Sequence, residues 1–419
     1  MLKQLLFYFI CCLSVRAVTI EGVQFHGNDK TSEGVLMTAL GDIVGIDLSE
    51  KEIAKEISQR IQNIRNLNIF ESVTHELVDR QLKVNLVEKW TVIPLLQFNV
   101  AGNTSQIRAG GFDTNFLGQY WELGGIYDYL NGLHAGVFWF YDKQFLNFGS
   151  ELGHEFWLIN NIQSLYDEKA ELKAEYVRRG MRIKSFYEFP YRENLKLGFA
   201  LSYENMGSQE SGLPNESIDD NRKNSYHIVG GRHAWLIPSV YVEWGQIDSF
   251  RYIFEGFKAR VDLSAAISET DPFFQFDLET LANFRISQLG YFSFRTYLNW
   301  KTSANSRHLL SAGSFEKIRG YYNGQFLGDL QVGANAELRW AFWDSKWFVP
   351  QGVIFADGIV NRNKGNPFLS ESESYGASVG VGLRALVPAI DRFGLRLDYA
   401  FALTENAGPG INFGVNQFF

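Results

Sequence analysis

The sequence predicts a mainly β protein: a transmembrane antiparallel barrel of about 16 strands, preceded by one small α/β domain. Aromatic residues make up 15% of the 419-residue chain, and 39 glycines against 9 prolines suit many strands and tight turns. The mean hydropathy of -0.15 is too polar for a bundle of spanning helices. Beyond the N-terminal segment no apolar run approaches the roughly 18 residues that a spanning helix needs, so strands must make any membrane crossing.

The N-terminal segment has the pattern of an export signal. Lys3 precedes an apolar stretch, Leu5 to Leu13, that is too short to span a bilayer, and Val15-Arg16-Ala17 offers a site to signal peptidase. We therefore expect residues 1–17 to be a signal peptide. The chain's two cysteines, Cys11 and Cys12, lie inside it, so the mature chain should hold neither a disulfide nor a thiolate metal site.

Charge and motifs exclude several classes of function. The formal net charge is -8, which does not suit a nucleic-acid partner. The seven histidines are scattered, and neither a His-Glu-x-x-His pair nor a phosphate-binding loop of the Walker type is present. We expect no enzymatic activity, no catalytic residue, no metal site and no cofactor.

Residues 18–92 predict the α/β domain. Val18 to Phe25 alternates like a half-buried strand and is followed by Gly27-Asn28, a turn signal. Ser49 and Glu52 form a capping box for a helix. The apolar stripe of this helix consists of Ile53, Ile57, Ile61, Ile64 and Leu67. Strands at Ile69 to Val78 and Gln81 to Lys89, separated by two residues, are expected to form a hairpin.

The order strand, helix, helix, strand, strand resembles a POTRA domain. Gly27-Asn28 after the first strand and Ile69 to Val73 at the start of the second carry this resemblance. A small sheet with a free edge can accept an extended chain as an additional strand, with the backbone supplying most of the affinity. The alternative is a plain spacer packed under the barrel.

Residues 95–419 predict the barrel. Segments of about ten residues alternate polar and apolar side chains and are separated by turn residues, as in membrane strands with one face toward lipid. Examples are Tyr120 to Tyr127, Phe292 to Trp300 and Leu395 to Ala402. The barrel should close between its first and last strands, near Gln97 and Phe413, because an unpaired backbone amide is costly in hydrocarbon.

Four segments, in order, resemble the superfamily of the assembly factor BamA, the translocation factor TamA and the two-partner secretion transporters. Asp113 to Gly118 resembles the periplasmic end of the second strand, and Gly313 to Tyr321 resembles a long loop with an Arg-Gly-aromatic tip. Gly352 to Gly358 resembles the strand that receives the arginine. Ile411 to Phe419 resembles the terminal strand that serves as the signal for barrel insertion, with Phe413, Val415 and Phe419 as its signal residues.

The arginine of the loop is the main candidate for a functional residue. We expect Arg319 to be held by Asp357, and the resemblance suggests Glu337 as a second partner, with the arginine stem or Tyr321 against Phe355. Gly320 completes the Arg-Gly-Tyr tip. The alternative is that Arg319 is a solvated loop residue.

The resemblance implies a non-enzymatic outer-membrane factor with its N-terminal domain in the periplasm. Its leading implied function is the insertion of unfolded outer-membrane proteins, taken up through the periplasmic domain and a barrel seam. The expected partners are the lipid bilayer and these client proteins, with periplasmic chaperones or accessory lipoproteins as further candidates. The alternatives are a polypeptide secretion transporter of the same superfamily, or a passive barrel or pore plugged by the loop.

Overall fold

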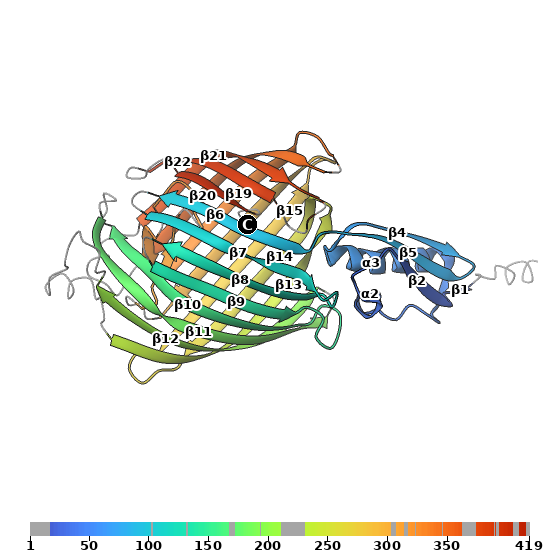
Figure 1. The fold of residues 1–419 in the computed structure, drawn as a ribbon, viewed down its shortest axis with the longest axis horizontal. Coiled ribbons are helices and arrows are strands. Elements are labelled where there is room, and N and C mark those ends of the chain that lie inside the picture. The colour runs from blue at the N-terminus through green and yellow to red at the C-terminus, as the bar shows by residue number, and fades with distance from the viewer. Residues whose placement is uncertain are drawn as a thin grey trace, which may run out of the picture.

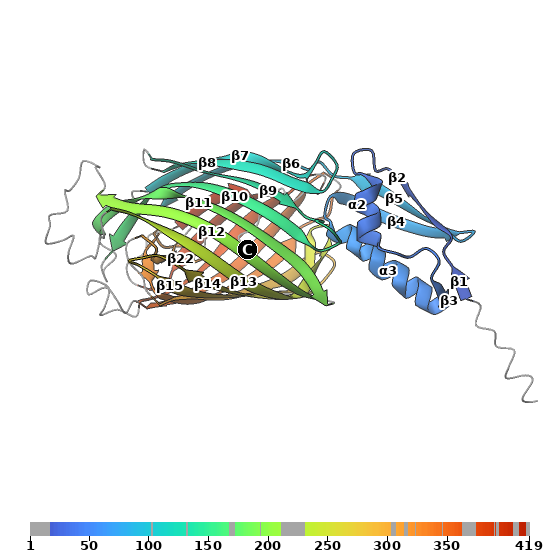
Figure 2. The same ribbon diagram turned by 90° about the horizontal axis from the view of Figure 1, so that it is seen from below.

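The computed structural model has a barrel with a small α/β part at one end (Figures 1 and 2). It describes residues 17–101, 104–130, 133–166, 172–192, 194–210, 231–302, 307–313, 317–322, 324–345, 347–362, 374–388, 390, 394–404 and 410–415. The predicted signal peptide therefore lies outside the described residues, except for Ala17. Within the described part of the chain, no helix is both long and apolar enough to cross a membrane.

The α/β part contains a three-stranded mixed sheet and two helices. Its elements are β1 (Ala17–Thr19), β2 (Gly22–His26), α2 (Glu33–Leu40), β3 (Asp47–Ser49), α3 (Glu50–Asn66), β4 (Phe70–Val78) and β5 (Gln81–Glu88). The sheet order is β2-β5-β4, with β2 parallel and β4 antiparallel to β5. The predicted hairpin is present, and its turn residues Asp79 and Arg80 both have positive φ.

The strand predicted from Val18 to Phe25 is divided in two. β1 pairs with β3, whereas β2 pairs with β5, so the two halves belong to different sheets. Between them the Ile20 side chain is fully buried and its carbonyl accepts from the Gly45 amide. Polar–apolar alternation continues through this point, and it cannot reveal that the hydrogen-bond partner changes.

Helix α3 forms the core of the α/β part. Its stripe of Ile53, Ile57, Ile61 and Ile64 is at most 5% exposed, and it belongs to one apolar cluster with sheet residues such as Leu82. The helix begins directly after Ser49, as expected for a capping residue. Helix α2 begins after Ser32, whose side chain accepts from the Val35 amide, and ends at Gly41, where φ is 68°.

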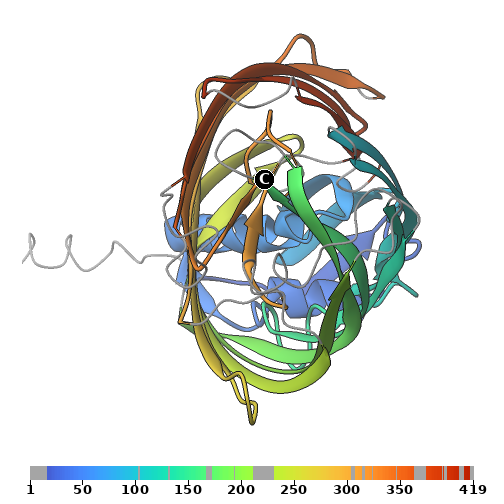
Figure 3. The same cartoon turned by 90° about the vertical axis from the view of Figure 1, so that its left-hand side faces the viewer.

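Sixteen strands form the barrel, as predicted (Figure 3). In chain order they are β6 (Val92–Ala101), β7 (Thr104–Phe116), β8 (Trp121–Leu130), β9 (Leu133–Asp142), β10 (Glu151–Tyr166), β11 (Leu172–Arg192), β12 (Leu195–Glu210), β13 (Gly231–Phe250), β14 (Ile253–Ala266), β15 (Phe273–Arg285), β16 (Gly290–Lys301), β19 (Leu330–Ala341), β20 (Val349–Arg362), β21 (Ser374–Leu386), β22 (Gly394–Ala402) and β23 (Gly410–Val415). All neighbours are antiparallel, and β23 returns to β6.

The barrel buries polar side chains and exposes apolar ones. On β19, Asn335 and Glu337 are fully buried, whereas the alternate residues Leu338 and Trp340 are 37% and 42% exposed. This is the reverse of a water-soluble sheet, and it fits a lipid-facing exterior around a polar lumen.

The seam between β23 and β6 is paired more sparsely than the other strand neighbours. Within the described residues, Asn412 pairs with Asn99 and Phe413 with Phe98, and no further pair joins the two strands. By contrast, β6 pairs with β7 over its whole length, from Val92 to Ala101. Among the described residues, which end at Val415 on β23, no pair joins the part of β6 from Val92 to Gln97 to β23.

The α/β part is docked on two sides of the barrel mouth. On one side the side-chain amide of Asn115 donates to Thr31 Oγ1 at 2.9 Å, and the backbone amide of Ser32 donates to the Gly118 carbonyl. On the other side Asn66, at the end of α3, donates to Asp248 Oδ1 at 3.1 Å. Residues 89–91 alone connect β5 to β6. Figure 3 shows the helices lying across the opening at the far end of the barrel.

Candidate functional site: a buried charge cluster that holds an inward loop

The segment between β16 and β19 folds into the barrel. It contains two short paired strands, β17 (Leu310–Ala312) and β18 (Phe326–Gly328), drawn in orange inside the ring in Figure 3. Ile318, Tyr321 and Phe326 of this segment pack against Tyr297 and Ile359 of the barrel wall. We call residues 307–328 the inward loop.

Arg319 is the most extensively bonded residue of the inward loop. Its Nε and Nη2 donate to the two carboxylate oxygens of Asp357, both at 2.8 Å, and its Nη1 donates to Glu337 Oε1 at 2.5 Å. Its backbone amide also donates to Asp357 at 3.1 Å. The structure thus brings Arg319 to Glu337 and Asp357, and because all three side chains are fully buried, the arginine is not a solvated loop residue.

An aromatic ring supports the guanidinium from one face. The Cζ atom of Arg319 lies 3.5 Å from the centroid of the Phe355 ring, a cation–π contact. A Cβ at Gly380 would lie 2.3 Å from this ring, so a glycine is needed where the ring approaches the neighbouring strand. It is the arginine head rather than Tyr321 that lies on Phe355.

The charge cluster extends beyond the residues expected from the sequence. Asp398 on β22 lies 3.5 Å from Arg319 Nη1, and Arg384 on β21 donates to Asp398 at 2.5 Å. Arg339 donates to Glu337 at 2.6 Å, and Arg396 is paired with Asp398. Four arginines, at positions 319, 339, 384 and 396, thus face three carboxylates, at positions 337, 357 and 398, and none of the seven is more than 6% exposed.

The missed residues lie at alternate positions of barrel strands. Asn335, Glu337 and Arg339 follow this spacing on β19, as do Arg396 and Asp398 on β22. The alternate spacing of these charged residues is visible in the sequence, but the strands of any barrel with a polar lumen show the same alternation. Only the three-dimensional arrangement shows that these strands meet at one loop residue.

Gly320 and Tyr321 fix the loop next to Arg319. Gly320 has φ of 89°, and a Cβ there would come within 3.3 Å of Ala400 and Ala402 on β22. The Tyr321 hydroxyl donates to the Ala377 carbonyl at 2.7 Å and accepts from the Ala377 amide. The tip therefore packs against β22, the neighbour of the seam strand β23, and against β21 beside it.

A second anchor holds the start of the inward loop on another part of the wall. His308 stacks on Phe273 with ring centroids 4.4 Å apart, and its carbonyl accepts from Lys301 Nζ at 2.8 Å. Arg307 and His308 are at most 4% exposed. The loop is thus held both at β15–β16 and at β19–β22.

The comparisons with known proteins agree with this arrangement. A model of the Omp85 superfamily domain matches residues 96–419. The chain belongs to the Omp85 superfamily. It is therefore a non-enzymatic protein of the outer membrane, and its N-terminal α/β part lies in the periplasm.

Solved structures of other Omp85-type barrels share the fold at low sequence identity. BamA from Haemophilus ducreyi lacking POTRA domains 1–3 is 17% identical, with a TM-score of 0.57 over 96% of this chain and 84% of that one. CdiB from Escherichia coli is 13% identical, with a TM-score of 0.62 over 94% and 75%. CdiB from Acinetobacter baumannii is 12% identical, with a TM-score of 0.61 over 96% and 74%. No curated protein sequence matches the chain.

One segment of this Omp85 barrel matches a hydrolase pattern in letters but not in structure. Gly376-Ala-Ser-Val-Gly380 has the form Gly-x-Ser-x-Gly, whose serine needs a strand-to-helix turn and an adjacent base. Here the segment lies inside β21, and Ser378 is 1% exposed. Its Oγ has no hydrogen-bond partner among the described residues. Groups of acidic, histidine and cysteine residues that could hold a metal are also absent from the described part of the chain.

The residues of the predicted terminal signal are described in part. Phe413 is half-buried and forms the seam pair with Phe98. Val415 is the last residue of β23, and its side chain is not among those described; Phe419 lies outside the described residues. The structure therefore places Phe413 at the seam, and the role of all three residues as an insertion signal stays a prediction.

Proposed function

We propose that this protein inserts unfolded barrel proteins into the outer membrane through the seam between β23 and β6. The observation that carries the proposal is the sparse seam: within the described residues two residue pairs join these strands, whereas β6 is paired with β7 along its whole length. A client strand that pairs with β6 would gain backbone hydrogen bonds that hydrocarbon cannot supply.

The inward loop supports a lateral rather than an axial route. It is held on two parts of the wall, by Arg319 and by His308, and its core residues are buried inside the barrel. A client moving straight through the lumen would have to displace these contacts, including the fully buried ion pairs of Arg319. A client entering at the seam would not.

A secretion transporter is the second candidate. The two CdiB structures have TM-scores of 0.62 and 0.61 with this chain, at least as high as that of BamA, so the fold favours neither branch. A secreted polypeptide would use the lumen, and the inward loop would then have to move during transport.

A disulfide across the seam tests the proposal. Asn99→Cys with Asn412→Cys would link the residues that pair there, and Asn361→Cys with Ser374→Cys would link an ordinary pair of β20 and β21 as the control. In vesicles containing the purified protein, the oxidised seam variant should lose most of its ability to fold an added barrel client, and reduction should restore it. Equal activity of the two oxidised variants would overturn the seam mechanism.

A parallel measurement separates the two functions in cells. Depletion should lower the amounts of many outer-membrane barrels if the protein is an insertion factor. If barrel levels hold and a single secreted protein disappears from the medium, the secretion transporter is the correct function. If neither the barrel proteins nor a secreted protein are lost and only the solute permeability of the outer membrane changes, the protein is a passive pore.

We also propose the division of the chain into an export signal of residues 1–17, a POTRA-like domain of residues 18–92 and a barrel of residues 95–419. The sheet and helices of the α/β part and the end of β5 at Glu88 support a boundary in this region, whereas the first barrel strand, β6, already begins at Val92 and pairs with β7 from there. Mass spectrometry of the protein purified from outer membranes tests the first boundary, because the mature chain should begin at Val18.

A further inference from the structure

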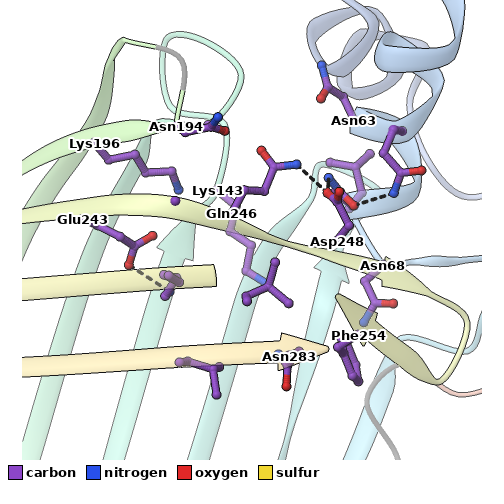
Figure 4. Close-up of a pocket in the computed structure, with 18 of the residues that line it drawn as sticks. Asn63, Asn68, Lys143, Asn194, Lys196, Glu243, Gln246, Asp248, Phe254 and Asn283 are labelled. Carbon is purple, nitrogen blue, oxygen red and sulfur yellow. Dashed lines mark hydrogen bonds and ion pairs between the residues drawn. The ribbon is translucent and has the colours of Figure 1, made fainter. Parts of the chain in front are cut away.

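A large chamber lies where the α/β part meets the barrel (Figure 4). Its volume is about 1670 Å³. Pockets for small ligands typically measure about 300 to 1,000 Å³, so the chamber is large enough for a segment of polymer. Its walls come from α3, from the ends of the barrel strands near the mouth and from Val387, Pro388, Ile390 and Gly394.

Side-chain amides are the most frequent polar groups of the chamber. Helix α3 presents one continuous face of them, and the barrel supplies others from the opposite side, as Figure 4 shows for Asn63 and Asn194. The amide residues are Gln59, Gln62, Asn63, Asn66 and Asn68 on the α/β part, and Asn194, Gln246 and Asn283 on the barrel. An amide side chain both donates and accepts, as a peptide group does, so such a surface can bind a backbone whatever its sequence.

Part of this amide set is free to bind. Gln62, Asn66 and Gln246 are used in a chain of hydrogen bonds that ends on Asp248. In contrast, the side chains of Gln59, Asn63 and Asn194 form no hydrogen bond within the described part of the chain. All three are exposed or half-buried and line the chamber.

The charges of the chamber are largely neutralised. Lys143 is paired with Glu122 at 2.5 Å, Lys258 with Glu243 at 2.8 Å, and Lys196 with Glu188 at 3.1 Å. A charged ligand would find these lysines and glutamates already paired, although Arg192 and Asp248 also line the chamber and have no ion pair among the described residues. Aromatic rings, including Tyr141, Trp244 and Phe254, fill the space between the pairs and offer contact to apolar side chains.

We infer that this chamber is a binding site for an extended, uncharged polypeptide segment rich in aromatic and amide side chains. The inference rests on the proposed function, because it assigns the place where a client is held before it reaches the seam. The backbone of the segment bonds to Gln59, Asn63 and Asn194, while its aromatic side chains contact the rings of the barrel rim. The last ten residues of this chain, Gly410 to Phe419, have this composition and contain no charged side chain.

A synthetic peptide of residues 410–419, amidated at its end, is the probe. A photo-crosslinking amino acid is introduced into the full-length protein in lipid nanodiscs at Asn63, facing the chamber, or at Ala54, an exposed residue of α3 that does not line it. The Asn63 variant should crosslink to the peptide and the Ala54 variant should not. The heat-dependent gel shift of a folded barrel confirms that each variant is intact.

Two measurements of affinity extend the test. Gln59→Ala, Asn63→Ala and Asn194→Ala together should weaken peptide binding about tenfold, since each removes a hydrogen bond of modest net strength. A peptide with Asp in place of Asn412 and Asn416 should also bind at least several-fold more weakly. Unchanged affinity in both measurements would overturn the chamber as the binding site.

A third crosslinking position, Leu96 on β6, separates this inference from the proposed function. If the peptide crosslinks at position 96 but not at position 63, the chamber is not its binding site and insertion at the seam still stands. If it crosslinks at position 63 but not at position 96, the chamber is supported as the binding site and the seam mechanism is contradicted. Absence of crosslinking at both positions would overturn both.

Discussion

The two sides of the barrel interior hold their charges in different ways. On β19–β22, Glu337, Asp357 and Asp398 are paired with arginines, and both members of each pair are buried. On β11 and β13, Glu188 and Glu243 are also buried, with side chains 10% and 9% exposed, but their lysine partners Lys196 and Lys258 are 37% and 42% exposed. The first side holds a loop in one position, whereas the second faces a chamber that is open to water.

Part of the difference lies in the chemistry of the cation, although Arg260 also lies 3.4 Å from Glu188 and 3.9 Å from Glu243 on the second side. A guanidinium offers five donors in a rigid planar fork and can bind two carboxylates at once, as Arg319 does. An ammonium on a flexible stem is a compact, strongly hydrated charge that can move with its partner. Burial makes the arginine cluster costly to disrupt, while exposure makes the lysine pairs weak and adaptable.

The largest effect is expected from Arg319→Ala. The change leaves Asp357 buried without its paired cation and removes one of the arginines bonded to Glu337, which should lower the free energy of unfolding by about 3 to 5 kcal/mol. Urea titration of the protein in lipid vesicles measures this quantity. Arg319→Lys is the control: it keeps the charge but cannot reproduce both bonds, and should recover only part of the loss. An unchanged midpoint for the alanine variant would contradict the role of Arg319 as the main anchor.

Two matched carboxylate changes test the comparison directly. Glu337→Gln removes the buried carboxylate paired with Arg339 and one of the two carboxylates bonded to Arg319, and should cost about 2 to 3 kcal/mol. Glu243→Gln removes the charge partner of Lys258 and Arg260, which are 42% and 32% exposed and keep their access to water, and should cost about 1 kcal/mol or less. If the two variants lose the same free energy of unfolding in the urea titration, the charge pairs of β19–β22 and of the chamber side contribute equally to stability.

A glycine of β21 tests how closely the inward loop must approach the wall. A Cβ at Gly376 would lie 2.5 Å from the Phe326 ring and 3.1 Å from the Tyr321 ring, so Gly376→Ala should displace the loop and cost about 1 to 3 kcal/mol. The control is Gly358→Ala on the adjacent strand, where the nearest atom is 4.0 Å away. Protease cleavage of the loop in folded protein should increase for the first variant only.

The smallest effect is expected at an exposed lysine. Lys258→Met removes one cation beside Glu243 on the chamber side, but the lysine is 42% exposed and Arg260 stays 3.9 Å from Glu243, so stability should change by about 0.5 kcal/mol or less. Raising the salt concentration should shift the unfolding midpoint of the unmodified protein little for the same reason. A loss comparable to that of Glu337→Gln would show that exposure does not weaken these pairs.

The sequence predicts the architecture well because its signals are repeated. Sixteen strands, the apolar stripe of α3 and the hairpin of β4 and β5 all follow from periodic patterns and turn residues. The division of the first strand at Ile20 was not predictable, since alternation is the same on both sides of it. What changes there is the partner, and a pattern within one strand does not identify the strand beside it.

The candidate site was predictable where a motif marked it. Arg319, Glu337 and Asp357 were expected together, whereas Asp398, Arg339, Arg384 and Arg396 were not. These four residues have the ordinary spacing of lumen-facing positions, so their sequence context does not distinguish them from other inward charges. The second anchor at His308 was missed for another reason: it depends on a ring of β15 that lies next to the loop only after the barrel has closed.

The short connection between β5 and β6 limits how far the periplasmic part can move. Residues 89–91 can span at most about 10 Å when fully extended. Because β6 is also a seam strand, a displacement of the α/β part beyond this reach must either move β6 or break the pairing of its first residues with β7. A client that pulls on the periplasmic part would thus transmit its tension to the seam without any other moving element.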